Sequence, residues 1–186
     1  MTKTLLFLYD LLWTLASLCS LPLIPLLKRG PLAERLGLLL PAERTGTPAL
    51  WVHALSVGEV LSAVPLVLAL RARHPHTPVV FTATTLQGLF VARRELEGKV
   101  DQILRMPLDA WWGMRRLVDH IHPVLYIVVE TDLWPGLLGR LRKRRIKAVL
   151  VNGRISPRTY RGYRRYRFLV RSLLFGGLDQ CLMQTE

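Results

Sequence analysis

Acidic residues are missing from a quarter of this 186-residue chain. No Asp or Glu occurs between Leu133 and Leu178, yet this stretch holds 13 of the 26 Lys and Arg residues. The whole chain carries a formal net charge of +13. A solvated basic face usually contains interspersed acids, so the run indicates a surface for a polyanion: an anionic membrane, a phosphorylated substrate or nucleic acid.

Cysteine and low-complexity sequence are also scarce. Cys19 and Cys181 lie far apart, and neither belongs to a CxxC motif or a His-rich cluster. This argues against a disulfide framework and against a zinc site. No cofactor is expected. Apolar residues make up 51% of the chain. That fraction and the length predict one folded domain with a short appendage.

The N-terminal segment is the longest apolar run. Residues 5–27 contain a single charged residue, Asp10, and such a run is long enough to cross a bilayer as a helix. We therefore predict a membrane-anchor helix over residues 1–28. Pro22 and Pro25 would kink or end that helix, so spanning the bilayer and lying in one leaflet both stay open. The cations that follow favour a cytoplasmic domain, and no signal-peptidase site is evident.

The rest of the chain alternates between strand-like and helix-like segments. After a connector at 29–48, strands are predicted at 49–54, 78–84, 100–106, 124–130, 147–153 and 178–184. Helices are predicted between them at 58–73, 86–97, 109–120, 135–145 and 158–175. This alternation predicts an α/β fold over 49–186: a Rossmann-like parallel sheet with helices on both faces.

Ligands bind such sheets outside the carboxyl ends of the strands. Polar or small residues follow five of the predicted strands: Ser56, Gly58 and Glu59; Thr84, Thr85 and Gly88; Asp109; Glu130 and Asp132; Asn152, Arg154 and Ser156. Each alone could be a helix cap or a turn residue. Together they favour a binding site at this rim of the sheet.

Glu59 is the candidate for acid–base chemistry. It falls in the first turn of a predicted helix, where the helix N-terminus should lower the pKa of its carboxyl. The same position aims it into the crevice, where a carboxylate could act as general base on an acceptor hydroxyl. Gly58 would let the backbone bend or approach a ligand. His53 is interpreted as a packed or hydrogen-bonded core residue.

Five motifs in order give the sequence a family resemblance. They are "WVHALSVGEV", "TATTLQG", "MPLD", "VVETDLWPGLL" and "VLVNGRISPRTYRGY". With the apolar segment before them, they resemble the 3-deoxy-D-manno-octulosonic acid (Kdo) transferases of lipopolysaccharide assembly. The resemblance implies a metal-independent, inverting GT-B glycosyltransferase at the cytoplasmic face of the bacterial inner membrane, which transfers Kdo from CMP-Kdo to the lipid A precursor, lipid IVA.

The resemblance also implies roles for individual residues. Glu59 matches the glutamate that serves as general base in the family. Glu130 and Asp132 match its Glu-x-Glu-x-Trp-Pro pattern, with Asp132 one methylene shorter than the second glutamate. The family's Asn-Ala-Arg stretch stands here as Asn152-Gly153-Arg154, so these positions are expected to bind substrate with Ser56, Gly58, Thr84, Thr85 and Gly88.

The basic region fits such an acceptor. Arginine binds phosphates in a bidentate manner, and 158–175 mixes Arg with Tyr and Phe as membrane-interface helices do. The expected partners are therefore the lipid A precursor and anionic inner-membrane lipids. Specific nucleic-acid binding is not expected, because an apolar anchor and an acidic rim at Asp109, Glu130 and Asp132 oppose it.

Only one set of βαβ repeats is present. A GT-B enzyme has two Rossmann-like domains, so the resemblance implies an acceptor-side, N-terminal domain whose contacts to CMP-Kdo come from a second domain absent from this chain. Two alternatives stay open: a non-catalytic membrane-associated module that binds anionic lipid, and another GT-B glycosyltransferase that acts on a lipid-linked acceptor.

Overall fold

The computed structural model describes residues 2–20 and 31–184. Its centre is a six-stranded sheet in the order β3-β2-β1-β4-β5-β6, in which every neighbouring pair is parallel. The strands are β1 (Ala49–Ala54), β2 (Val79–Ala83), β3 (Gln102–Arg105), β4 (Pro123–Val129), β5 (Lys147–Gly153) and β6 (Gln180–Met183). The Rossmann-like α/β fold predicted from the sequence is confirmed.

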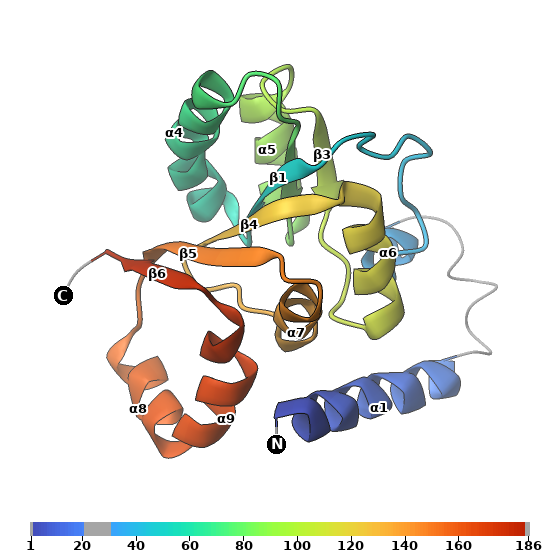
Figure 1. Cartoon of the computed structure of the whole chain (residues 1–186), viewed down its shortest axis with the longest axis vertical. Helices are drawn as coiled ribbons and strands as arrows, with labels where there is room; N and C mark the ends of the chain where they lie inside the picture. Colours follow the sequence, from blue (N-terminus) through green and yellow to red (C-terminus); the bar gives the residue numbers. More distant parts are fainter. Residues whose placement is uncertain (1, 21–30, 185–186) are drawn as a thin grey trace.

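Helices cover both faces of this sheet (Figure 1). On one face, α4 (Val57–Arg73) and α5 (Leu86–Leu96) pack with the strands into one core cluster. On the other, α6 (Trp111–Ile121) and α7 (Pro135–Lys143) form the second. All six residues of β1 are buried, which explains why this strand reads as a continuous apolar run.

One predicted helix is wrong in its extent. Residues 158–175 do not form a single helix, because the backbone leaves the helical conformation at Tyr166, with φ −107° and ψ 30°. The segment divides into α8 (Pro157–Arg165), α9 (Arg167–Leu173) and a 3-10 turn, η2 (Phe175–Gly177). After the break, α9 contacts α7 and the N-terminal helix.

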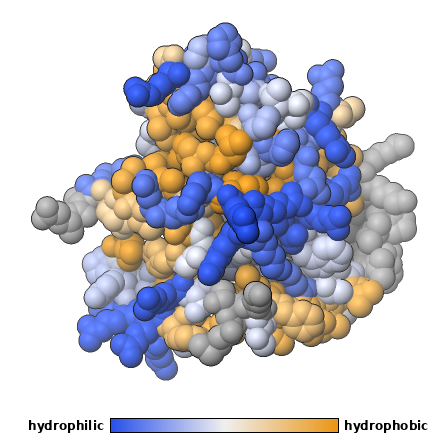
Figure 2. All heavy atoms as spheres, viewed as in Figure 1, coloured by the Kyte–Doolittle hydropathy of each residue, from blue (hydrophilic) through white to orange (hydrophobic). Residues whose placement is uncertain are grey.

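The N-terminal helix, α1 (Thr2–Ser20), lies beside α7 and α9. It keeps an apolar stripe exposed to solvent: Phe7, Leu8, Leu11, Leu12, Leu15 and Leu18. Figure 2 shows apolar atoms along the lower edge of the molecule, where Figure 1 places α1. Within residues 2–20 and 31–184, no helix combines the length and the apolar composition needed to cross a membrane. Pro22 and Pro25, where the anchor was predicted to kink, lie outside the described residues.

Asp109 joins α1 to the body of the domain. Its side chain is fully buried, accepting hydrogen bonds from the Tyr9 hydroxyl (2.9 Å) and from the amides of Gly136 (2.6 Å) and Leu137 (2.8 Å) at the start of α7. Burial raises the pKa of Asp109 to about 7. The prediction that Asp109 belongs to an open acidic rim is therefore wrong, because the carboxylate is used inside the protein as a helix cap.

Candidate functional site

Glu59 lies where β1 passes into α4. Its side chain is only 6% exposed, and its Oε2 accepts a hydrogen bond from the amide of Leu55 at 2.6 Å. Burial raises the pKa of the Glu59 carboxyl, and the negative charges of Glu130 and Asp132 raise it further, against the lowering by the Leu55 amide. The expected lowering of this pKa by the helix N-terminus is therefore outweighed by loss of solvent. A carboxyl shifted in this direction is a stronger base once ionised.

Glu59 shares a cavity of about 540 Å³ with Glu130 and Arg154. The Arg154 Nη2 atom lies 3.1 Å from Glu130 Oε2. The Glu130 side chain is 11% exposed and that of Arg154 is 69% exposed, so the guanidinium forms the outer wall of the pair. The site thus combines two buried carboxylates with one cation that solvent can reach.

The backbone at the ends of β4 and β5 is strained in the same way. Glu130 has φ 64° and Asn152 has φ 55°, in the left-handed region that residues other than glycine seldom adopt. The Glu130 amide nevertheless donates to Val151 O at 2.9 Å, so the neighbouring strand holds the turn in place. Strain of this kind is common at functional sites, and here it accompanies the carboxylate that enters the cavity.

The remaining cavity wall is largely apolar and aromatic. It is formed by Leu133, Leu150, Ile155, Tyr163, Phe175 and Met183, together with the polar side chains of Thr131, Ser156 and Thr159. The Tyr163 and Phe175 rings pack edge to face, with centroids 5.8 Å apart. A cavity lined by both charged and apolar side chains suits an amphipathic ligand.

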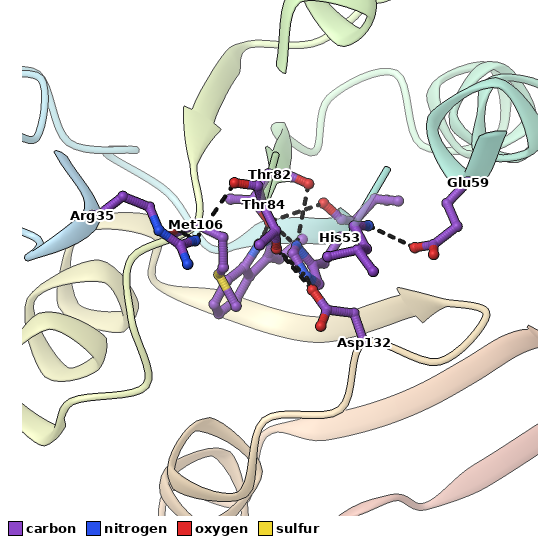
Figure 3. A network of polar contacts seen from close by, with 10 residues as sticks. Arg35, His53, Glu59, Thr82, Thr84, Met106 and Asp132 are labelled. Carbon is purple, nitrogen blue, oxygen red and sulfur yellow. Dashed lines mark hydrogen bonds and ion pairs between the residues drawn. The ribbon is translucent and has the colours of Figure 1, made fainter. Parts of the chain in front are cut away.

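A second polar group lies beside Glu59, deeper in the sheet (Figure 3). His53 is fully buried, and its Nε2 lies 2.9 Å from Asp132 Oδ2. The Thr84 hydroxyl donates to the same oxygen at 2.7 Å. Burial raises the pKa of Asp132, but the hydrogen bonds and charge of His53 and the Thr84 hydroxyl outweigh it, so the net shift is downward. Asp132 is held as a carboxylate, and the sequence-based interpretation of His53 as a hydrogen-bonded core residue is confirmed.

Three other predicted site residues lie at the starts of α4 and α5. Thr85 caps α5, since its hydroxyl accepts from the Gly88 amide at 3.0 Å. A Cβ on Gly88 would lie 2.9 Å from that hydroxyl and 3.2 Å from Leu55 O, so the close packing of the two turns requires glycine. Ser56 precedes α4 without a side-chain capping bond.

Gly58 and Asn152 differ from what the sequence suggested. Gly58 does not have a positive φ, and a Cβ there would meet nothing within 4 Å, so the expected sharp bend is absent. Asn152 lines a separate groove between α4 and β6, with Leu66 and Leu182 among its neighbours, rather than the cavity of Glu59. The structure therefore groups Glu59, Glu130 and Arg154 in one cavity, with Thr84 and Asp132 in the adjacent network.

Arg35 is a rim residue that the sequence analysis missed. It ends the short helix α3 (Pro31–Arg35), and its Nη1 donates to the carbonyl oxygen of Met106 (3.0 Å), with a longer contact to that of Thr84 (3.5 Å). Figure 3 places Arg35 and Glu59 at opposite ends of the network around His53. The sequence showed only a cation in a predicted connector, because no local pattern reports which strand ends a connector will cross.

No metal-binding cluster is found in the described part of the chain: within it, no three His, Cys, Asp or Glu side chains are grouped as metal ligands. The chemistry that these residues support is acid–base catalysis by a carboxylate next to a cation.

Comparison with known proteins identifies the family of this chain. Residues 31–186 match the family model described as 3-deoxy-D-manno-octulosonic-acid transferase (kdotransferase). The chain belongs to the Kdo transferase family. It corresponds to the N-terminal part of these transferases, as the sequence motifs predicted.

Kdo transferases of several bacteria are similar to this chain. The Haemophilus influenzae 3-deoxy-D-manno-octulosonic acid transferase is 36% identical over 135 residues, which cover 73% of this chain and 31% of that protein. The Chlamydia trachomatis transferase is 30% identical over 152 residues, covering 82% and 35%. The chain thus spans about a third of the length of the curated relatives that it matches.

A solved structure shares the fold of this Kdo transferase domain. The putative UDP-N-acetylglucosamine 2-epimerase from Listeria monocytogenes superposes with a TM-score of 0.52 at 18% identity, over 76% of this chain and 40% of that one. This likeness concerns the arrangement of strands and helices alone.

Proposed function

We propose that the chain is the acceptor-side domain of a Kdo transferase that transfers Kdo from CMP-Kdo to the lipid A precursor. One observation carries the proposal: Glu59, a buried carboxylate with a raised pKa, opens into the same cavity as the Glu130–Arg154 pair. Family membership gives the reaction class, and the cavity supplies a base and a cation where an acceptor would lie.

Glu59 is the proposed general base. A glycosyl transfer with inversion needs a carboxylate that removes the proton from the acceptor hydroxyl as this oxygen attacks the donor sugar. The Leu55 amide fixes one carboxylate oxygen of Glu59 and leaves the other for the hydroxyl. Contacts to the nucleotide part of CMP-Kdo belong to a second domain in this proposal, and no metal or cofactor takes part.

Arg154 is the proposed phosphate ligand. Its guanidinium is mostly exposed at the mouth of the cavity while one nitrogen stays on Glu130, so its other donors remain available to an acceptor phosphate. The cavity's apolar wall would then meet the acyl-bearing part of a glycolipid. A cavity that offers both a cation and apolar side chains fits a phosphorylated, lipid-bearing acceptor better than a small soluble sugar.

The same end of the molecule is the proposed membrane surface, at the cytoplasmic face of the bacterial inner membrane. Figure 1 places α1, α8 and α9 together there, and α1 contacts α9. α1 contributes exposed apolar side chains, while α8 and α9 bury no residue and carry Arg158, Arg161, Arg164, Arg165, Arg167 and Arg171. Apolar side chains beside cations bind anionic lipid surfaces.

A second candidate function uses only this surface. A non-catalytic module that binds anionic lipid is favoured by α8, because a cationic helix without a buried residue contributes little to the core. Another GT-B transferase with a lipid-linked acceptor would use the same cavity with different contacts. The candidates differ in the lipid selectivity that they predict: an acceptor-side domain should prefer the lipid A precursor to simple anionic phospholipids, whereas a non-catalytic module should bind both alike.

Competition between lipids tests the proposal. The chain is bound in detergent to a fluorescent lipid A precursor, and unlabelled precursor or phosphatidylglycerol is added as competitor. We expect unlabelled precursor to compete at much lower concentration than phosphatidylglycerol, and Arg154→Ala to reduce this difference. Equal competition by the two lipids would favour the non-catalytic module.

A further inference from the structure

Main-chain carbonyl groups hold Arg35 at the ligand-binding edge of the sheet. Its Nη1 atom donates to Met106 O at 3.0 Å and makes a longer contact with Thr84 O at 3.5 Å. These two residues directly follow β3 and β2, so the guanidinium lies at the carboxyl ends of these strands, where Rossmann-like sheets bind ligands. The backbone of the rim, rather than an acidic side chain, therefore fixes the position of Arg35.

The charge of Arg35 has no acidic partner of its own. The carboxylate of its neighbour Glu34 lies instead beside Arg105, with Oε2 3.6 Å from Nη1. Asp132 belongs to the network around His53, where its Oδ2 lies 2.9 Å from the histidine Nε2. Among the residues that the structure describes, no acidic side chain forms an ion pair with Arg35.

The surroundings make an unpaired cation at this position unfavourable. Arg35 is partly buried, and burial lowers the pKa of its guanidinium. The positive charge of Arg105 lowers this pKa further, whereas the negative charge of Asp132 raises it. An anion that contacts Arg35 would offset both the lost hydration and the repulsion by Arg105.

The Arg35 side chain keeps donors for such an anion. A guanidinium carries several N–H donors in a planar fork, and both carbonyl contacts of Arg35 use the same atom, Nη1. In Figure 3 the other terminal nitrogen is turned away from these carbonyl groups. Parallel N–H groups of a guanidinium match the oxygens of a phosphate group. Because the side chain is already held in place, less conformational entropy is lost when an anion binds.

We infer that Arg35 is a second phosphate-binding residue of the candidate site, which binds one phosphate group of the acceptor while Arg154 binds the other. Figure 3 places Arg35 and Glu59 at opposite ends of the network around His53, and Glu59 shares its cavity with Arg154. The two arginines therefore suit an acceptor with two separate phosphate groups, such as the lipid A precursor. The inference rests on the proposed function, since that function supplies the phosphorylated acceptor.

The first experiment tests for the anion site without any lipid. The Nε–H signal of Arg35 is followed by two-dimensional ¹H–¹⁵N NMR of the wild-type chain during titration with sodium phosphate at constant ionic strength, and it is assigned by its loss in Arg35→Lys. Arg116 is the matched control, because it is exposed and its Nη2 also contacts a main-chain carbonyl, that of Leu38, at 3.5 Å. We expect a saturable shift of the Arg35 signal alone. No shift, or equal and unsaturated shifts of both signals, would overturn the anion site.

The second experiment measures binding of detergent-solubilised lipid A precursor. Arg35→Gln should lower the affinity by roughly tenfold, because a hydrogen-bonded contact with a charged group is lost. Its amide can still donate to a carbonyl group, and Arg35→Lys, which keeps the charge without the planar fork, should lose less affinity. Arg116→Gln should bind as the wild type does. Melting temperatures of all variants identify any loss that comes from unfolding, and Arg35→Lys carries the comparison if Arg35→Gln unfolds.

The two monophosphorylated forms of the precursor show which group Arg35 binds. The form that lacks the phosphate assigned to Arg35 should bind equally to the wild type and to Arg35→Gln, whereas the other form should still bind the variant about tenfold more weakly. Arg154→Ala should show the reverse preference. If Arg35→Gln weakens the binding of both forms equally, the assignment of one phosphate to each arginine is wrong.

The outcomes separate this inference from the proposed function. Precursor binding that is equal in the wild type, Arg35→Gln and Arg35→Lys would overturn the role of Arg35 and leave the proposed function standing. No binding by the wild-type chain would overturn the proposed function and remove the acceptor phosphate assigned to Arg35, even if inorganic phosphate shifts the Arg35 signal.

Discussion

The rim of the sheet and the α8–α9 segment both carry charged side chains, but the rim largely shields them from solvent and α8–α9 expose them. At the rim, the Glu59 carboxylate is buried and the Asp132 side chain is only 14% exposed, and each is fixed by hydrogen bonds over less than 3 Å. α8 and α9 have no buried residue, and their arginines extend into solvent. Figure 2 shows hydrophilic atoms at the lower left, where Figure 1 places α8.

This difference predicts that the rim determines which ligand binds, whereas α8–α9 determine how strongly the chain is attracted to anionic surfaces. A buried charge with a fixed orientation favours one arrangement of ligand donors and acceptors, and a wrong ligand leaves it unpaired at a high cost. An exposed arginine attracts many kinds of anion, and salt screens this attraction. We therefore expect changes at the rim to alter which ligand binds or reacts, and changes in α8–α9 to alter mainly how strongly the chain meets an anionic surface.

The largest effect is expected from Glu59→Gln. In an enzyme where this chain is joined to a donor domain, loss of the general base should reduce the transfer rate by roughly 10²–10⁴-fold. Transfer is measured by mass spectrometry of the acceptor. Acceptor affinity should stay near that of the wild type, because the amide of glutamine has nearly the shape of the carboxyl group. Loss of binding without a loss of rate at saturating acceptor would contradict the assigned role.

The next effect is expected from Arg154→Ala. Removing a charge-assisted contact to an acceptor phosphate should lower affinity for the lipid A precursor by roughly tenfold to a hundredfold. Arg158→Ala, in α8 and outside the cavity, is the matched control and should change affinity little at moderate salt. Equal losses in the two variants would remove the distinction between the rim and α8–α9.

A smaller effect, on stability, is expected from Asp109→Asn. Gly136 and Leu137 donate to different oxygens of Asp109, and asparagine replaces one of these oxygens by an NH₂ group that cannot accept, so the variant should lose about 1–3 kcal/mol in free energy of unfolding. Because the pKa of Asp109 is raised to about 7, its protonation stabilises the folded state fully below about pH 4, and this contribution is lost as the pH rises through 7.

Thermal unfolding at pH 5 and pH 8 checks this prediction. We expect the melting temperature of the wild type to fall more between these values than that of Asp109→Asn. Tyr9→Phe, which removes one donor and keeps the carboxyl group, is the companion variant and should retain the pH dependence. An equal pH dependence in wild type and Asp109→Asn would mean that another group titrates.

The smallest effect is expected from Gly58→Ala. A Cβ at this position meets nothing within 4 Å, so the free energy of unfolding should change by no more than about 0.5 kcal/mol. Gly88→Ala, whose Cβ would contact Thr85 and Leu55, should lose about 1–3 kcal/mol in chemical denaturation. If Gly58→Ala lowers precursor affinity without a change in stability, the ligand approaches the backbone there.

Much of the fold was predictable because its signals are local. Buried parallel strands read as short apolar runs, and the predicted bounds of β1 and β5 match those of the structure. The break at Tyr166 was not predictable, because the contacts of α9 with α7 and α1 decide it rather than the composition of 158–175. The exposed apolar stripe of α1 likewise follows from which side of the helix meets α7.

The position of the candidate site could be predicted from the sequence, but some of the residues assigned to it could not. Residues after the strands meet at one edge, which identified Glu59, Glu130 and Arg154 together. Sequence could not show that Asp109 is buried as a cap or that Asn152 faces another groove, because both depend on which way a turn directs its side chain. The raised pKa of Glu59 required the burial that only the packed structure reveals.

The most direct test of the acceptor site is a map of where the lipid A precursor binds. Amide hydrogen exchange of the chain is followed by mass spectrometry with and without the precursor in detergent, and with phosphatidylglycerol as control. We predict protection of 55–60, 130–134 and 150–156 by the precursor alone, with α1 and α8–α9 protected by both lipids. Protection confined to α1 and α8–α9 with both lipids would contradict the account.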